Sequence, residues 1–250
     1  QLCIRHCIWG EIYTGGKFYC TGGWIEARIK TTPHTGNFPA FWMMPQTQLT
    51  WPNSGEIDIW EQINGDNMSH HTIHSAWGNK TLGQPDQESP VKTTSAPCTV
   101  AQWHVYALEW DQDALKWYVD GVLKFTYKNM HYSDSKYSEE MAWPFSKPFY
   151  IILNQSVGNG SWAANPDTSF DYLTEFDYVR VYQKKDAIDY YSTDDGHVSG
   201  IEDAVSGSIS DPSLPVEYYN LQGIRMDGDN LVPGVYIRRQ GHDATKVLIR

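Results

Sequence analysis

Residues 104–127 read HVYALEWDQDALKWYVDGVLKFTY, and this stretch predicts an antiparallel β-meander. Its two runs, 104–110 and 115–127, are rich in aromatic and β-branched residues and are separated by the polar DQDA. Asp120-Gly121 is a dipeptide typical of a tight hairpin turn, because both residues tolerate positive φ. The stretch therefore favours an all-β fold.

Strand patterns dominate the sequence on both sides of this meander. Only residues 131–142 have a helical pattern, and it is weak. Many short strands separated by Gly, Pro, Asn and Asp are typical of a β-sandwich or jelly roll. The further strands are expected at 24–30, 36–45, 56–63, 71–77, 148–157 and 176–183.

Composition divides the chain of 250 residues into three parts. A large domain is expected over 1–184. Residues 185–215 are acidic and rich in Ser, Asp and Gly, which predicts a linker. Strand patterns return over 216–250, a segment too short for a large core of its own and therefore expected to form a small β appendage.

The charge balance and the aromatic content narrow the range of functions. The chain has 19 Lys and Arg against 30 Asp and Glu, a net charge of −11. This balance argues against a nucleic-acid partner, which needs a basic face. No apolar run approaches the roughly 20 residues that span a bilayer. The 11 Trp and 16 Tyr suit all-β domains and also the flat faces of sugars.

The four cysteines do not indicate a metal site. They are Cys3, Cys7, Cys20 and Cys98, and none belongs to a C-x-x-C pair, so no structural zinc is expected. Three arrangements stay open: a Cys3–Cys7 disulfide, a Cys20–Cys98 disulfide, or buried free thiols.

The motif GEIDIWE at residues 55–61 carries the chemistry. On a regular strand Glu56 and Asp58 share a face, whereas Glu61 would point into the core, where a lone carboxylate is costly. One extra residue at Ile59–Trp60, a β-bulge, returns Glu61 to the face of the other two. The alternative is an acidic strand face that is merely solvated.

Three carboxyl groups on one sheet face would divide into ionised and protonated members. Retaining glycosidases need this division, with one ionised nucleophile and one protonated acid. We assign Glu56 as the nucleophile and Glu61 as the general acid/base, with Asp58 between them to hold or tune a proton.

The chain resembles glycoside hydrolase family 16, the laminarinase and lichenase group, over about residues 10–184. The segments that carry the resemblance are, in order, GKFYCTGGWIEARIK, FPAFWMMP, WPNSGEIDIWE, WHVYALEW, WYVDG, PFYIILNQSVG and FDYVRVYQ. The resemblance implies a concanavalin A-like jelly roll with an open cleft, and retaining, endo-acting hydrolysis of β-1,3-1,4 or β-1,3 glucan. It also implies a polysaccharide partner and no cofactor or metal for catalysis. The alternatives are an agarase- or carrageenase-like galactan hydrolase, a non-catalytic carbohydrate-binding β-sandwich, and an inactive fragment.

Five further residues are candidates for substrate contact. Trp162 would stack on a sugar from a loop at the cleft rim, and Trp51 would flank the reacting sugar. The family resemblance places His74 close to the reacting sugar; a structural histidine is the alternative. Asn154 and Gln155 end a strand, so that one should face the cleft and the other should not. Trp42, Trp110 and Trp117 are expected in the core.

Further expectations concern the ends of the resemblance and the tail that follows it. Family members carry further N-terminal strands, so the domain is expected to be truncated. Asp177 matches a position that often contributes to a structural calcium site, and we do not expect the ion here. The tail, with YNLQG, PGVYI and KVLIR, resembles the C-terminal sorting domain of proteins exported by the type IX route of Bacteroidetes. A secreted or cell-surface location is therefore expected, and the protein is also expected to be a monomer.

Overall fold

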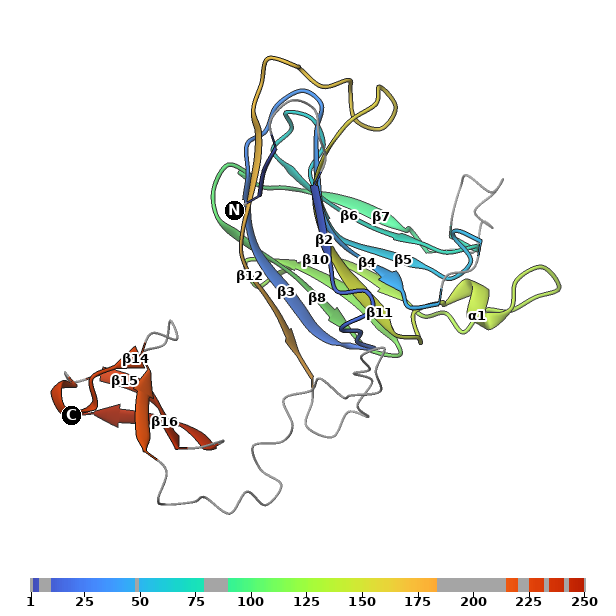
Figure 1. Cartoon of the computed structure of the whole chain (residues 1–250). Helices are drawn as coiled ribbons and strands as arrows, with labels where there is room; N and C mark the ends of the chain where they lie inside the picture. The colour runs from blue at the N-terminus through green and yellow to red at the C-terminus, as the bar shows by residue number, and fades with distance from the viewer. Residues whose placement is uncertain are drawn as a thin grey trace. The chain divides into compact units, whose positions relative to one another are not determined.

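The chain forms two compact units, Gln1–His197 and Val198–Arg250 (Figure 1). The computed structural model describes residues 2–4, 10–47, 50–78, 90–183, 215–219, 225–231, 234–240 and 243–249. The expected linker, apart from Pro215, lies outside the described residues. Among the described residues, no helix is long and apolar enough to cross a membrane.

Two six-stranded antiparallel sheets build the first unit (Figure 1). We call them the front sheet, which contains β5, and the back sheet, which contains β3. The order in the front sheet is β2 (Gly10–Tyr13), β11 (Phe149–Val157), β4 (Asn37–Pro45), β5 (Glu56–Glu61), β6 (Met68–His74) and β7 (Thr93–Pro97). The order in the back sheet is β1 (Leu2–Ile4), β12 (Tyr172–Tyr182), β3 (Gly23–Thr31), β8 (His104–Trp110), β9 (Ala114–Val119) and β10 (Val122–Lys128).

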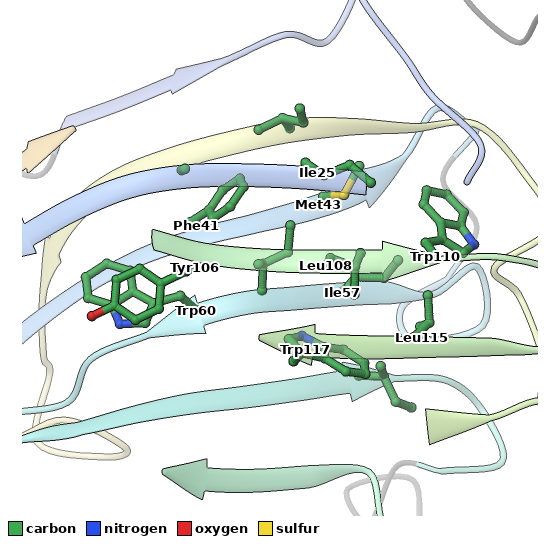
Figure 2. Packing of buried hydrophobic residues seen from close by; sticks show 14 of the residues in the cluster. Ile25, Phe41, Met43, Ile57, Trp60, Tyr106, Leu108, Trp110, Leu115 and Trp117 are labelled. Atoms are coloured by element: carbon green, nitrogen blue, oxygen red, sulfur yellow. The ribbon is translucent and has the colours of Figure 1, made fainter. Parts of the chain in front are cut away.

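The core lies between the two sheets because each strand alternates its side chains. In β3 the residues Ile25, Ala27 and Ile29 are fully buried, whereas their neighbours along the strand are only partly buried. Figure 2 shows the same interior from close by, with Phe41 and Met43 of the front sheet among the residues of the back sheet. The all-β sandwich predicted from the sequence is confirmed.

The meander predicted over residues 104–127 forms β8, β9 and β10, and each strand pairs with the next. Asp120 and Gly121 have φ of 51° and 76°, and positive φ at both central residues is what a two-residue turn of type I′ requires. The predicted core positions of Trp110 and Trp117 are confirmed, since both are almost fully buried. Strands β1, β2 and β7 have no counterpart in the sequence prediction.

The helical pattern at 131–142 yields only α1 (Glu139–Ala142). Ser138 caps this turn by accepting a hydrogen bond from the Met141 N–H at 3.2 Å. Pro144 follows directly after the C-terminal cap, Trp143, and a proline disfavours helical geometry in the residue before it. The helix therefore stops after one turn.

The second unit contains a four-stranded antiparallel sheet, which agrees with the strand patterns seen in the tail. Its order is β14 (Arg225–Met226), β13 (Val216–Tyr219), β15 (Gly234–Gln240) and β16 (Asp243–Ile249), with a 3₁₀ turn, η2, at Gly228–Asn230.

Cys20 and Cys98 are buried free thiols, so the Cys20–Cys98 disulfide is excluded. Burial raises the pKa of the Cys20 thiol to about 12. The Cys98 Sγ lies 3.2 Å from the Tyr106 hydroxyl. Cys7 lies outside the described residues, so the Cys3–Cys7 pairing stays a prediction.

Candidate active site

β5 contains the bulge that the spacing of its carboxylates predicts. The strand pairs with β6 at Glu56, Ile57 and Asp58, and again only at Glu61. Ile59 and Trp60 are both fully buried in the core, one after the other. Two consecutive core-facing residues shift the alternation by one, so Glu61 returns to the outward face.

The outward face of the front sheet is hollowed over β5, and we call this hollow the cleft. It has a volume of about 250 Å³, and Glu56, Asp58 and Glu61 all line it. The strand register explains why. Glu61 lies between Ala40 of β4 and His70 of β6, while Asp58 lies between Trp42 and Thr72 in the neighbouring row.

Asp58 and Glu61 are held in surroundings that favour their neutral forms. Burial, followed by the charge of Glu56 and a hydrogen bond with it, raises the pKa of Asp58 well above its usual value. Burial, and then the charges of Asp58 and Glu56, raise the pKa of Glu61 in the same direction. A protonated Glu61 beside Glu56 gives the two kinds of carboxyl group that acid-assisted displacement requires.

Glu56 is contacted by two of the predicted aromatic residues. Trp51, itself 42% exposed, donates its indole N–H to Glu56 Oε2 at 2.8 Å. His74 Nε2 lies 3.7 Å from Glu56 Oε1 and 3.3 Å from Asp58 Oδ2. Burial lowers the pKa of His74. Both side chains thus lie beside the Glu56 carboxyl group.

Trp42 lines the cleft, so its predicted place in the core is wrong. Its indole N–H donates to Asn154 Oδ1 at 2.7 Å, which also puts Asn154 on the cleft wall. Glu11 of β2 lies opposite Asn154 in the register and lines the cleft as well. The sequence prediction did not include Glu11.

Gln155 does not reach the cleft, contrary to its assignment as a substrate contact. It is fully buried between the sheets. Its amide N–H donates to Asn37 Oδ1 at 2.8 Å, and its amide oxygen accepts from the Thr174 hydroxyl. Neighbouring residues on a strand face opposite sides, so Asn154 and Gln155 cannot share the cleft.

Trp162 lines a second hollow, of about 360 Å³, that shares Phe38 and Ser156 with the cleft. The indole is 62% exposed, and its ring centre lies 6.4 Å from that of His70. A large exposed ring at the continuation of the cleft is available for stacking on a sugar face.

The surroundings of Asp177 do not fit a calcium ion. The Arg28 guanidinium donates to Asp177 Oδ2 at 2.7 Å and so supplies a positive charge where an oxygen ligand would be needed. The neighbouring Glu175 is likewise paired with a cation, Lys30.

The sequence profile described as glycosyl hydrolases family 16 matches residues 5–179. The chain belongs to this family. Its resemblance to family 16 in the ordered motifs around GEIDIWE therefore reflects membership, and the sandwich with an open cleft is the family's jelly roll.

Three family 16 relatives give the range of similarity. The chain is 33% identical over 177 residues to the keratan-sulfate endo-1,4-beta-galactosidase of Sphingobacterium multivorum, which covers 70% of the chain and 40% of that protein. It is 33% identical over 181 residues to the beta-glucanase of Rhodothermus marinus, covering 69% and 61%. The X-ray structure of the laminarinase from Rhodothermus marinus superposes with a TM-score of 0.60 at 32% identity, covering 69% of this chain and 70% of that one.

The chain therefore spans between two fifths and three fifths of the length of these two curated family 16 relatives.

Proposed function

We propose that this family 16 chain is a retaining, endo-acting glycoside hydrolase that cleaves β-1,3 or mixed β-1,3-1,4 glucan. The observation that carries the proposal is the cleft in which Glu56, Asp58 and a Glu61 of raised pKa are brought onto one face by a bulge. The beta-glucanase and the laminarinase of Rhodothermus marinus support the choice of glucan.

In the first step Glu56 attacks the anomeric carbon and forms a glycosyl ester, while Glu61 gives its proton to the departing glycosidic oxygen. In the second step Glu61, now a carboxylate, takes a proton from water, whose oxygen attacks the same carbon and releases Glu56. The two inversions return the product with the original configuration.

The surroundings of Glu56 suit a nucleophile. The Trp51 indole N–H stabilises the carboxylate oxygen that it contacts and fixes the plane of the group. Asp58, kept protonated, hydrogen-bonds Glu56. When Glu56 becomes an ester it loses its charge, and the pKa of Asp58 then falls because the neighbouring negative charge is gone.

Hydrolysis of lichenan, laminarin and agarose by the unaltered chain and by Glu56→Gln tests this function. We expect the unaltered chain to release oligosaccharides from the two glucans. In Glu56→Gln the rate of release should be lower by at least about 10³-fold. Proton NMR of the first-formed product is expected to show the β anomer. No product from any polymer, or an active Glu56→Gln, would contradict the proposal.

A second candidate is a galactan hydrolase, because the chain is equally similar to the keratan-sulfate endo-1,4-beta-galactosidase of Sphingobacterium multivorum. Product from keratan sulfate or agarose, with none from lichenan or laminarin, would favour it. Binding of oligosaccharide without turnover would favour the non-catalytic alternative.

We further propose that the chain is exported and that the second unit acts as a sorting tail. The proposal rests on the resemblance of residues 216–250 to type IX sorting domains and on their forming a separate β-sheet unit. Fusion of residues 216–250 to a reporter in a Bacteroidetes host, followed by measurement of reporter in the medium, tests it. Size-exclusion chromatography with light scattering tests the expected monomer.

A further inference from the structure

The bulge in β5 interrupts its pairing with β6. The two strands are paired up to Asp58 and resume at Glu61, and at this interruption the carbonyls of Asp58 and Ile59 each accept a hydrogen bond from a side chain. A buried carbonyl without a donor costs about 1–3 kcal/mol of stability. The stability of the bulge therefore depends on the hydrogen-bond donors to the Asp58 and Ile59 carbonyls.

Two fully buried aromatic side chains supply the donors, one from the neighbouring strand β6 and one from the back sheet. The His71 ring, on the core face of β6, donates from Nδ1 to the Ile59 carbonyl at 2.7 Å. The Trp117 indole, on β9 of the back sheet, donates to the Asp58 carbonyl at 2.9 Å. Figure 2 shows Trp117 and Trp60 in this interior.

His71 is held in a single protonation state. A carbonyl only accepts, so Nδ1 carries the proton, and Nε2, at 2.8 Å from the Ser69 hydroxyl, is the acceptor. Burial, opposed by the bond to Ile59 and assisted by the nearby charges of His70 and Lys124, lowers the pKa of His71 to about 4. The imidazole is therefore neutral near pH 7.

The alternative to the bulge is a regular strand, in which Glu61 would turn into the core. The hydrogen bonds to the Asp58 and Ile59 carbonyls stabilise the bulged backbone. A regular strand would point these carbonyls elsewhere and would not form the same two hydrogen bonds. His71 and Trp117 contact the backbone two and three residues before Glu61, and neither of them lines the cleft.

We propose that His71 is a positioning residue that, with Trp117, holds the β5 bulge in the shape that presents Glu61 to the glycosidic oxygen. The inference rests on the proposed role of Glu61 as general acid/base. Loss of the His71 donor should misplace the acid while leaving Glu56 in position, because Glu56 lies before the bulge in a regularly paired part of the strand.

A matched pair of substitutions separates this role from packing. His71→Asn keeps an N–H donor at the position of Nδ1, whereas His71→Gln places its amide near the position of Nε2 and leaves the Ile59 carbonyl unpaired. Each variant is assayed on lichenan, whose leaving group needs a proton, and on a 2,4-dinitrophenyl β-glycoside, whose leaving group does not.

For His71→Gln we expect kcat/KM on lichenan to fall roughly 10- to 100-fold, part of the 10²–10⁴ that a general acid supplies. On the dinitrophenyl substrate kcat/KM should stay within about threefold, and sodium azide should raise kcat by replacing the water that needs a base. His71→Asn should recover most of the lichenan activity. Equal losses on both substrates, or identical behaviour of the two variants, would overturn the inference.

Glu61→Ala in the same assays separates this inference from the proposed function. If Glu61→Ala shows the leaving-group dependence and the azide effect but His71→Gln does not, only the positioning role fails. If Glu61→Ala hydrolyses lichenan normally, the proposed function fails. Should His71→Gln not fold, Trp117→Phe, which removes the indole donor together with part of the ring's volume, must show the same substrate dependence, and its absence there overturns the inference.

Discussion

Asp58 is almost fully buried and stays protonated more readily than an ordinary carboxyl group, since its pKa is raised well above 3.8 by burial and by Glu56. In the unfolded chain the same group ionises normally. The folded state therefore binds more protons between these two pKa values, and stability contributed by Asp58 declines as pH rises through that window.

Asp58→Asn should consequently stabilise the protein while impairing catalysis. At pH 7 its free energy of unfolding should exceed that of the unaltered chain, because an amide does not ionise and so loses no stability as pH rises through the window above 3.8. The gain should vanish below about pH 4. Urea unfolding at several pH values measures it, and parallel pH dependence of both proteins would contradict the explanation.

Glu61 predicts the alkaline side of the activity profile. Its raised pKa keeps the proton that the first step needs, so kcat/KM should fall as pH rises through a value well above 4.5. A pH–rate profile on lichenan locates this limb. In Glu61→Gln the residual kcat/KM on an activated aryl glycoside should not fall over the same pH range. If it still falls there, the alkaline limb belongs to another group.

β11 places two neighbouring residues on opposite sides of one sheet, and their substitutions should have opposite effects. Gln155→Met leaves the buried Asn37 Oδ1 without its donor, at a cost of about 1–3 kcal/mol in the free energy of unfolding, while the Thr174 hydroxyl loses Gln155 but keeps its contact with the Thr31 hydroxyl. Its kcat/KM should stay near normal at a temperature where it is folded.

Asn154→Ala is the matched variant on the same strand. It removes a group from the cleft wall and the acceptor for Trp42, so kcat/KM should fall about 3- to 10-fold with little change in stability. Thermal unfolding and steady-state kinetics on both variants test the pair. A stability loss confined to Asn154→Ala would reverse the assignment of the two faces.

Strand patterns were sufficient to predict the sandwich, because most core strands alternate cleanly. β4 was the exception for the site: NFPAFWMMP is apolar on both faces, so nothing in the run shows that Trp42 points to the cleft. A strand with aromatic side chains on its cleft face has the same continuous apolar sequence as a strand that is buried on both faces.

The bulge was predictable from the odd spacing of Glu56 and Glu61 together with the cost of burying a carboxylate. The choice between Asn154 and Gln155 was not, since an alternating strand has two equivalent phases until its neighbours are known. The role proposed for His71 depends on its contact with the carbonyl of Ile59, twelve residues away, and no local pattern reveals such a contact.

At the scale of the whole molecule the electrostatics are acidic. The net charge is −11, and within the described residues the cleft is lined by Glu11, Glu56, Asp58 and Glu61 but by no Lys or Arg. The negative charge of the chain and of the ionised carboxylates in the cleft repels sulfated or carboxylated polysaccharides. It has little effect on the binding of neutral glucans.

Salt should therefore distinguish the two candidate substrate classes. Raising ionic strength from about 0.01 M to 0.5 M shortens the screening length several-fold. Any kcat/KM on keratan sulfate should rise with salt, whereas that on lichenan should stay constant. A rate on keratan sulfate that is high in low salt and falls as salt is added would indicate cationic recognition and contradict this expectation.

The pair of sequestered cysteines offers a way to time how often the sandwich interior opens. A thiol-reactive reagent reaches Cys20 only when the sheets separate, and its high pKa keeps the sulfur protonated and unreactive until then. Cys98 contacts the Tyr106 hydroxyl, and the Tyr106 ring stacks on Trp60 on the core side of β5. Oligosaccharide protection of Cys98 from labelling, located by peptide mass, would report that sugar binding stiffens this strand from the inside.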